Sequence, residues 1–115
     1  VSLYDLYPDG RSIFLGDGIL RARFLTSFEN PTLLQPEEVG EFNIDLWHIG
    51  HVFKVGHRIR LQISSASHLR SDINSCTGND LASDTEISNS QIRIHFGPSW
   101  PSHVAVHRLP LDMIT

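Results

Sequence analysis

Hydrophobic and polar residues alternate along most of the chain with a period of two, which places successive side chains on opposite faces of an extended strand. In residues 58–63 the apolar side chains are Ile59, Leu61 and Ile63, and the residues between them are polar. The other segments with strand character are 1–7, 19–25, 41–46 and 91–96. We therefore predict short strands that each turn one apolar face inward.

Turn residues separate these predicted strands. Pro8-Asp9-Gly10 combines a restrained φ with a permissive glycine, and Gly16-Asp17-Gly18 has a similar composition. The one long irregular link is 67–89, a length that is typical of functional or mobile loops. No window has a sustained helical period of apolar residues. An antiparallel sheet with one apolar face has to bury it, so we expect an all-β fold, a jelly-roll β-sandwich.

The size and charge of the chain exclude several classes of partner. With 115 residues it matches one domain. The net charge of -4 gives no attraction to phosphate backbones or anionic lipid, so we predict neither a nucleic acid nor a membrane partner. No apolar run approaches the roughly 20 residues of a membrane span, and no signal peptide is recognisable.

Cysteine content favours a reducing compartment. Cys76 is the only cysteine, so no disulfide can form within the chain and a thiolate zinc site has too few sulfurs. We therefore expect a cytoplasmic location.

No nucleophile motif of the α/β-hydrolase type is present in the sequence. Such enzymes carry their serine on a Gly-x-Ser-x-Gly elbow, whose small residues allow the sharp turn from strand to helix. The nearest approach is Gly97-Pro98-Ser99, where proline and Trp100 flank the serine. We therefore predict no catalytic residue and no enzymatic activity for this chain alone.

Seven histidines raise the question of a metal site. His103 and His107 lie four apart on a predicted strand, which separates them by about 13 Å. His48 and His51 flank a probable turn, but no Glu or Cys stands at an offset typical of a zinc site. We predict no metal and no cofactor, and we expect surface or hydrogen-bonding roles for the histidines.

The link 67–89 concentrates Asp, Asn and Glu, the oxygen donors that calcium prefers. It is not an EF-hand, because counting from Asp72 places Thr77 where glycine is needed and Ser83 where a bidentate carboxylate is needed. A solvated acidic loop is the favoured interpretation, and an irregular calcium site stays open as the alternative.

Aromatic and arginine side chains offer candidate contacts. Trp47 and Trp100, with Tyr4, Tyr7 and Phe28, have the ring faces that a sugar-stacking platform uses, although a core or interdomain position is favoured. The predicted outward faces carry a row of arginines: Arg21, Arg23, Arg58, Arg60 and Arg93. Such a row either pairs across strands with Asp45 or Glu41, or docks onto another domain.

Several ordered motifs carry a family resemblance. Residues 5–13 read Asp-Leu-Tyr-Pro-Asp-Gly-Arg-Ser-Ile, and residues 18–23 read Gly-Ile-Leu-Arg-Ala-Arg. The stretches 42–47 and 52–65 follow in order, and Leu109-Pro110-Leu111 stands near the end. Together they resemble the C-terminal domain of the X-Pro dipeptidyl-peptidase, cocaine-esterase and α-amino-acid ester hydrolase family. Ordered motifs over nearly the whole chain are more specific than one short pattern.

The resemblance implies a fold, a partner and a set of contacts. It implies a galactose-binding-like jelly-roll packed beside an α/β-hydrolase catalytic domain of the parent chain, which does the chemistry. One departure lies after Ser65, where the family continues to a Phe-Pro and an Arg-Asn-x-Asn-Thr-Gly loop that 74–78 keep only approximately. We expect interdomain or ligand contacts at Trp47, Trp100, Arg58, Arg60 and Asn74.

The resemblance also implies that the domain begins upstream. The chain opens at Val1 within a predicted strand, so we assign 1–115 to the C-terminal part of a single β-sandwich domain that lacks its first strands. Two other functions stay open: a carbohydrate-binding module on the same fold, and a free-standing interaction protein. The second would form homo-oligomers through open strand edges.

Overall fold

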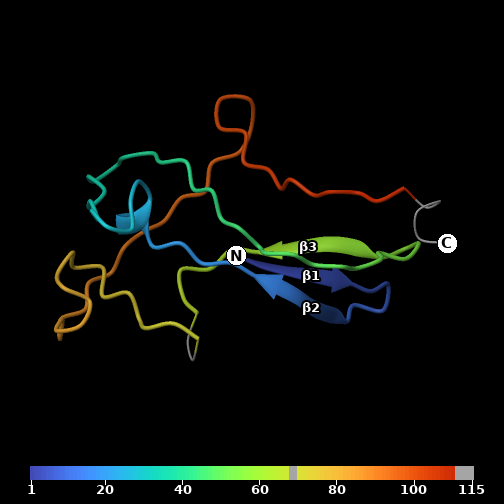
Figure 1. Cartoon of the computed structure of the whole chain (residues 1–115), viewed down its shortest axis with the longest axis horizontal. Coiled ribbons are helices and arrows are strands. Elements are labelled where there is room, and N and C mark those ends of the chain that lie inside the picture. The colour runs from blue at the N-terminus through green and yellow to red at the C-terminus, as the bar shows by residue number, and fades with distance from the viewer. Residues whose placement is uncertain (68–69, 111–115) are drawn as a thin grey trace.

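The structure, a computed structural model, describes residues 1–67 and 70–110 and contains one antiparallel sheet. The central strand β1 (Ser2–Leu6) lies between β2 (Ser12–Asp17) and β3 (Arg58–Gln62), as Figure 1 shows. The other regular element of the described residues is the short 3₁₀ helix η1 (Ala22–Phe24). The predicted all-β character is confirmed, and so are the predicted strands near 1–7 and 58–63.

A tight turn joins β1 to β2. Gly10 adopts a φ of 90°, which a side chain would disfavour, and its N–H donates to the carbonyl of Tyr7 at 3.0 Å. The side chain of Asp9 accepts from the N–H of Arg11 at 3.0 Å. The turn predicted at Pro8-Asp9-Gly10 is therefore confirmed. The turn predicted at 16–18 is wrong, because Gly16 and Asp17 end β2 and pair with β1.

The register of the sheet decides which side chains share a face. Asp5 lies opposite Ile13 on β2 and Ile59 on β3, and residues directly opposite one another project from the same face. Leu3 and Leu61 are paired on that face as well. The other face carries Tyr4 with Phe14 and Arg60. One carboxylate thus stands among aliphatic side chains on the central strand.

Three predicted strands are absent from the described residues. Residues 19–25 turn into η1 and its flanks, whereas 41–46 and 91–96 carry no strand pairing. The segment that continues to residue 110 runs past the sheet without joining it (Figure 1). A period-two pattern predicts a strand only where a ladder partner is present, because the backbone N–H and C=O groups need pairing.

Little apolar surface is buried in the described residues. Leu3, at 7% exposure, is the only large apolar side chain among them that is buried. The accessible surface is 10074 Å², whereas a folded monomer of this mass exposes about 6,300 Å². The radius of gyration is 17.3 Å, against about 13 Å for a compact domain of this length. The sheet therefore has an apolar surface that the rest of the chain does not cover.

The connection before β3 packs closely on the end of β2. A Cβ atom added at Gly18 would lie 2.1 Å from the backbone oxygen of Asp45. We expect Gly18→Ala to lower the free energy of unfolding by about 1–3 kcal/mol, because backbone has to shift. Gly50→Ala is the matched control, since nothing lies within 4 Å of its added Cβ. Urea unfolding of both variants checks this, and equal midpoints would contradict the packing.

Candidate domain-contact surface

A carboxylate and two histidines form the best-connected polar cluster of the described residues. The side chain of Asp5 is 1% exposed. Its carboxylate lies 2.9 Å from Nε2 of His51, and both of its oxygens lie 2.9 Å from Nδ1 of His57. The cluster joins β1 to the connection that leads into β3.

Local geometry holds the two histidines in place. The N–H of His57 donates to the carbonyl of Lys54 at 3.0 Å, and Gly56 allows this turn with a φ of 85°. The ring of His57 lies 4.1 Å from that of Tyr7. The ring of His51 meets Phe53 edge-on at 4.9 Å. Both imidazoles are thus positioned by ring packing as well as by the carboxylate.

The environment of Asp5 has two opposing effects on its acidity. Burial raises the pKa of Asp5, but the hydrogen bonds and positive charge that His57 and His51 can supply lower it by more. The pKa of Asp5 therefore lies below the ordinary aspartate value. The carboxylate is the form that the fold stabilises.

Sequence reasoning missed this cluster. The sequence predicts a surface or hydrogen-bonding role for His51, and Asp5 and His57 stand out in it only as members of the family motifs. The signal was nevertheless present, because Asp5 shares the period-two face of Leu3 in a strand that was expected to be half buried. A charge on such a face requires partners, and histidines are among the groups that can supply them.

One carboxylate of the acidic link 67–89, that of Asp84, is satisfied by hydrogen bonds within the link. Asp84 accepts from Nδ2 of Asn79 at 3.3 Å, from the N–H of Glu86 at 3.0 Å, and from the hydroxyl of Thr77. Hydrogen bonds from Ser75 and Thr77 hold the pKa of Asp84 well below its usual range. In residues 1–67 and 70–110, no three His, Cys, Asp or Glu side chains are placed to hold a metal ion.

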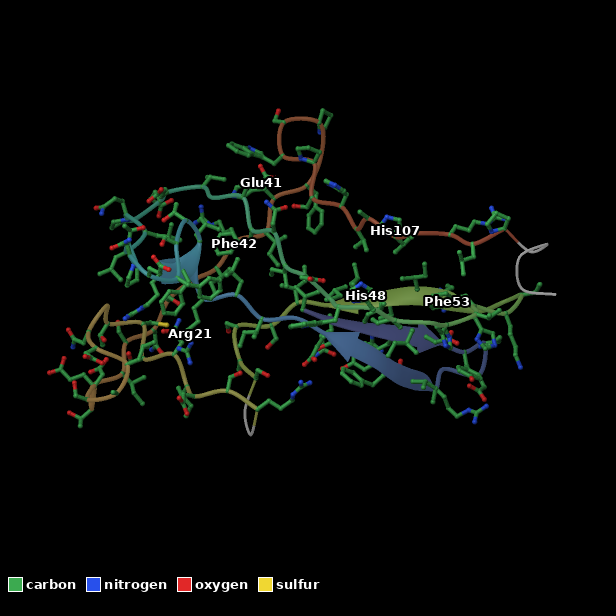
Figure 2. All side chains as sticks on the ribbon, viewed as in Figure 1. Arg21, Glu41, Phe42, His48, Phe53 and His107 are labelled. Atoms are coloured by element: carbon green, nitrogen blue, oxygen red, sulfur yellow. The ribbon has the colours of Figure 1, made fainter. Side chains whose placement is uncertain are left out.

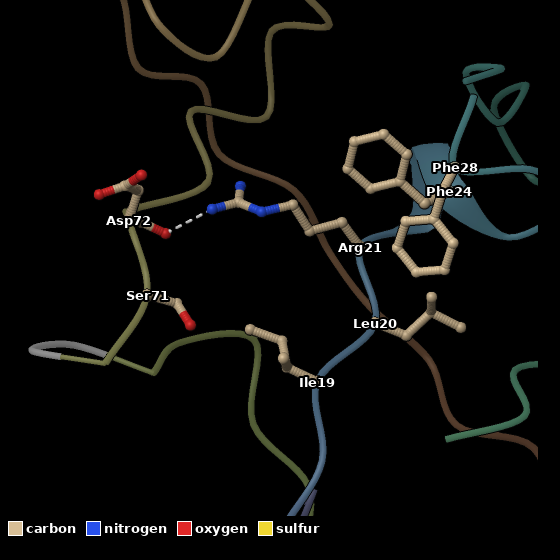
Figure 3. A pocket seen from close by; sticks show the side chains of 7 residues that line it. All are labelled: Ile19, Leu20, Arg21, Phe24, Phe28, Ser71 and Asp72. Carbon is tan, nitrogen blue, oxygen red and sulfur yellow. Dashed lines mark hydrogen bonds between the residues drawn. The ribbon is translucent and has the colours of Figure 1, made fainter. Parts of the chain in front are cut away.

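An apolar recess lies between η1 and the start of the acidic link (Figure 3). Its volume is about 310 Å³, and its apolar walls are Ile19, Leu20, Phe24 and Phe28. Arg21 crosses it and donates from Nη2 to the carbonyl of Asp72 at 2.9 Å. Its other terminal nitrogen, Nη1, is buried without a hydrogen-bond partner among the described residues. The recess can take an apolar side chain and leaves one donor available.

The predicted contact residues are exposed, and the structure does not gather them into one site. Trp47 is 76% exposed and Trp100 is 48% exposed. Trp100 lies 5.8 Å from His95, whereas Trp47 joins no aromatic pair of the described residues. Arg58 and Arg60 alternate along β3 and share a face, and Asn74 accepts from the N–H of Cys76.

The arginine row does not pair as predicted. Among the described residues no ion pair joins it to Asp45 or Glu41. Arg23 instead donates to the carbonyl of Asn79 at 2.9 Å, and Arg60 to the hydroxyl of Ser12 at 3.2 Å. The prediction of cross-strand pairs is wrong because three of the strands that it needs, 19–25, 41–46 and 91–96, are absent from the described residues.

Many large apolar side chains of the described residues are exposed. Figure 2 draws the side chains on the ribbon and labels Phe42 and Phe53 on the connection between η1 and β3, and His107 in the last described segment. We call the following exposed apolar side chains, which include members from both faces of the sheet, the contact surface: Phe14 and Ile59 on the sheet, Trp47, Val52 and Val55 before β3, and Ile92 and Phe96 in the last described segment.

The chain is similar to one known protein family and to a longer enzyme. The family model for the X-Pro dipeptidyl-peptidase C-terminal non-catalytic domain matches residues 1–105. A curated relative, a cocaine esterase of Rhodococcus sp. (strain MB1 Bresler), is 42% identical over 106 residues. That alignment covers 90% of this chain and 18% of the relative, so the chain spans under a fifth of the relative's length. No helix of the described residues is long and apolar enough to cross a membrane.

Proposed function

The chain belongs to the family of X-Pro dipeptidyl-peptidase C-terminal non-catalytic domains, and we propose that it is an accessory β-sandwich domain packed against an α/β-hydrolase catalytic domain of the same polypeptide. The family assignment confirms the resemblance carried by residues 5–13 and 52–65. The role that we propose is structural: this domain covers and positions the hydrolase, which supplies the nucleophile.

The excess of accessible surface, together with the exposed large apolar side chains, is the observation that carries this proposal. The chain exposes about 3,800 Å² more than a folded monomer of its mass, the difference between 10074 Å² and about 6,300 Å². A standard protein interface covers only about 800 Å² on each partner. One small partner would leave most of the excess exposed, whereas a contiguous polypeptide several times longer can cover it. The low coverage of the cocaine esterase, 18%, supports a polypeptide of that kind.

The same polypeptide would complete the fold. Residues 41–46 and 91–96 keep the alternation of strands and have no partner among the described residues. We propose that strands outside this chain pair with them, so that 1–115 is the C-terminal part of a single jelly-roll. The open edges of β2 and β3 support this, because unpaired sheet edges in folded domains are normally covered.

We propose contact roles for the five residues singled out from the sequence: Trp47, Trp100, Arg58, Arg60 and Asn74. Trp47 is the strongest of them. Its backbone holds a φ of 64°, which is costly for an aromatic residue, and its N–H donates to the side chain of Asp45 at 2.7 Å. A large exposed ring held in a strained conformation is typical of an interface anchor.

Photo-crosslinking in the longer polypeptide tests this function. We expect p-benzoylphenylalanine at Trp47 or Trp100 to crosslink to peptides of the hydrolase part, which mass spectrometry identifies. Glu29, an exposed charged position in a turn, is the control site. Absence of any crosslink to the hydrolase part from both tryptophan positions would contradict the proposal. Turnover of p-nitrophenyl esters by this chain alone would contradict its accessory role.

The compartment that we propose is the cytoplasm. The exposed thiol of Cys76 is free and has no cysteine in the chain with which to pair, which is typical of reducing compartments.

A further inference from the structure

Asp5 is the only charged side chain of the described residues that is fully buried, and it holds two partners from one segment. His51 and His57 both belong to the connection into β3, six residues apart, and both turn a ring nitrogen toward the same carboxylate on β1. Hydrogen-bond contacts from two histidines thereby hold the connection on the central strand β1.

We propose that Asp5, His51 and His57 form a proton-operated latch that holds residues 49–57 on β1 while Asp5 is ionised and releases them when Asp5 is protonated. The latch is a property of this chain. Its consequence for domain contact rests on the function proposed above, because the latched segment carries part of the contact surface.

The hydrogen-bonding chemistry makes the carboxylate the controlling group. Neutral His51 can donate from Nε2 and neutral His57 from Nδ1, and each protonated ring can donate from the same atom. Both contacts are therefore available whether or not the histidines carry charge. Protonation of Asp5 removes its negative charge and turns one oxygen into a hydroxyl, so the carboxyl becomes a weaker acceptor for the two ring nitrogens. The acid form therefore holds His51 and His57 less strongly than the carboxylate does.

The surroundings of Asp5 supply no second acceptor or charge from the sheet. The residues opposite it on β2 and β3 are Ile13 and Ile59, which cannot titrate. The two arginines of β3, Arg58 and Arg60, project from the other face. On the connection itself, Lys54 is exposed.

Among the described hydrogen bonds and ion pairs, none joins a side chain of the hairpin turn to the carboxylate of Asp5. Asp9 of that turn is paired with Arg11 at 2.7 Å. Tyr7 contacts His57 through its ring. The groups that face the carboxylate with ring nitrogens at hydrogen-bond distance are His51 and His57.

Release of the latch would act on the contact surface. Trp47 lies two residues before the latched segment, and Val52 and Val55 lie within it, with exposures of 65% and 102% for the two valines. A segment that swings away from β1 presents these side chains in many positions, so that it loses the shape that a partner surface matches. Acid would thereby uncouple this domain from its partner before the β1–β2 hairpin unfolds.

Hydrogen exchange of the full chain tests the latch. Protection factors, corrected for the pH dependence of intrinsic exchange, are compared between peptides covering 49–57 and peptides covering 2–17, from pH 7 to pH 2. Among the described residues, the N–H of His57 is the backbone donor of 49–57 that has a backbone acceptor, the carbonyl of Lys54. We expect the protection of this N–H to fall about tenfold or more as Asp5 becomes protonated, while the hairpin keeps its protection. Asp5→Asn should show low protection of the same N–H at every pH.

Two variants keep the test decisive. Asp9→Asn removes an exposed carboxylate of the same hairpin and should retain the wild-type transition. His51→Leu removes one of the two histidine contacts to Asp5 and should make residues 49–53 more mobile, a result that can be measured even if Asp5→Asn fails to fold. Simultaneous loss of protection in both regions, an unchanged segment in His51→Leu, or an equal effect of Asp9→Asn would overturn the latch.

A separate measurement isolates the link to domain contact. The yield of the crosslink from position 47 in the longer polypeptide should fall over the same pH range as the protection of the His57 N–H. A latch that opens without any change in this yield would refute the uncoupling and leave the domain's accessory role intact. Absence of the crosslink at neutral pH would instead count against the accessory role.

Discussion

Replacing Asp5 by alanine should lower the melting temperature of the chain by roughly 10 °C, a shift typical of small domains in which a buried polar network is broken. The substitution leaves the ring nitrogens of His51 and His57 without their shared acceptor. It also leaves a space between Ile13 and Ile59 on the central strand. Circular dichroism of the thermal transition measures the effect.

The pH dependence of stability follows from the same carboxylate. The pKa of Asp5 in the folded chain lies below its value in the unfolded chain. The stabilisation is therefore present above the ordinary aspartate pKa and is lost as the pH falls through the lower, folded value. The urea midpoint of the wild type should be steady above about pH 5 and should fall in more acid solution.

The variants separate Asp5 from the other carboxylates. The pKa of Asp9 is also lowered, through hydrogen bonds from the backbone and side chain of Arg11, but that pair is exposed and screened by solvent. Asp9→Ala should therefore change the melting temperature far less than Asp5→Ala. The acid loss should be shallower in Asp5→Asn, while Asp84, whose pKa is lowered too, continues to contribute. Equal effects of Asp5→Ala and Asp9→Ala would contradict a special role of the cluster.

Charged substitutions in the last described segment should affect stability little in the isolated chain and strongly in the longer polypeptide. Ile92 and Phe96 are 66% and 70% exposed in this chain, so the double variant Ile92→Asp/Phe96→Asp should change the stability of the isolated chain by no more than about 0.5 kcal/mol. The same variant should reduce binding of the dye ANS, because it removes exposed apolar surface.

In the longer polypeptide the same double variant should be strongly destabilising. Burial of an isoleucine and a phenylalanine against a partner contributes about 1.5–3 kcal/mol each, and a buried carboxylate adds a desolvation cost. We therefore expect a loss of at least about 3 kcal/mol, measured by urea unfolding, with a shorter half-life of hydrolase activity at elevated temperature.

The matched control uses the polar positions of the same segment. Gln91→Asp/His95→Asp introduces the same two aspartates on the opposite face of the alternation. This control should behave like the wild type in both contexts. If the Ile92/Phe96 variant is as stable as that control within the longer polypeptide, then residues 91–96 do not bury their apolar face there.

The strands that could be predicted from the sequence are those whose partners lie in the described chain. β1 and β3 were recognised from alternation, and the turn at Pro8-Asp9-Gly10 from its residue types. Residues 41–46 and 91–96 have equally regular alternation but no pairing. Alternation states which face a strand would bury, whereas pairing depends on a second segment, which local pattern does not reveal.

The predicted contact residues, too, were recognisable from the sequence only in part. The type of residue suited to an interface, such as Trp47, was recognisable from the sequence, because large rings are favoured there. Its exposure and strained backbone came from the structure. Arg21, Arg23 and Arg93 of the arginine row were predicted on strands that are absent from the described residues, whereas Arg58 and Arg60 lie on β3. The hydrogen bonds of Arg21 and Arg23 go to loop carbonyls, and that of Arg60 goes to the hydroxyl of Ser12.

The sequence by itself determined that this protein is a β-rich member of its family, that its alternating segments each have an apolar face, and that no nucleophile elbow is present. Those properties depend on residue types and on spacings of a few positions, which are local. Only the tertiary structure decided that Asp5 meets His51 and His57 across separations of 46 and 52 residues, and that most large apolar side chains of residues 1–67 and 70–110 stay exposed. Such meetings depend on sheet register and on the path of the connections, which residues distant along the chain set together.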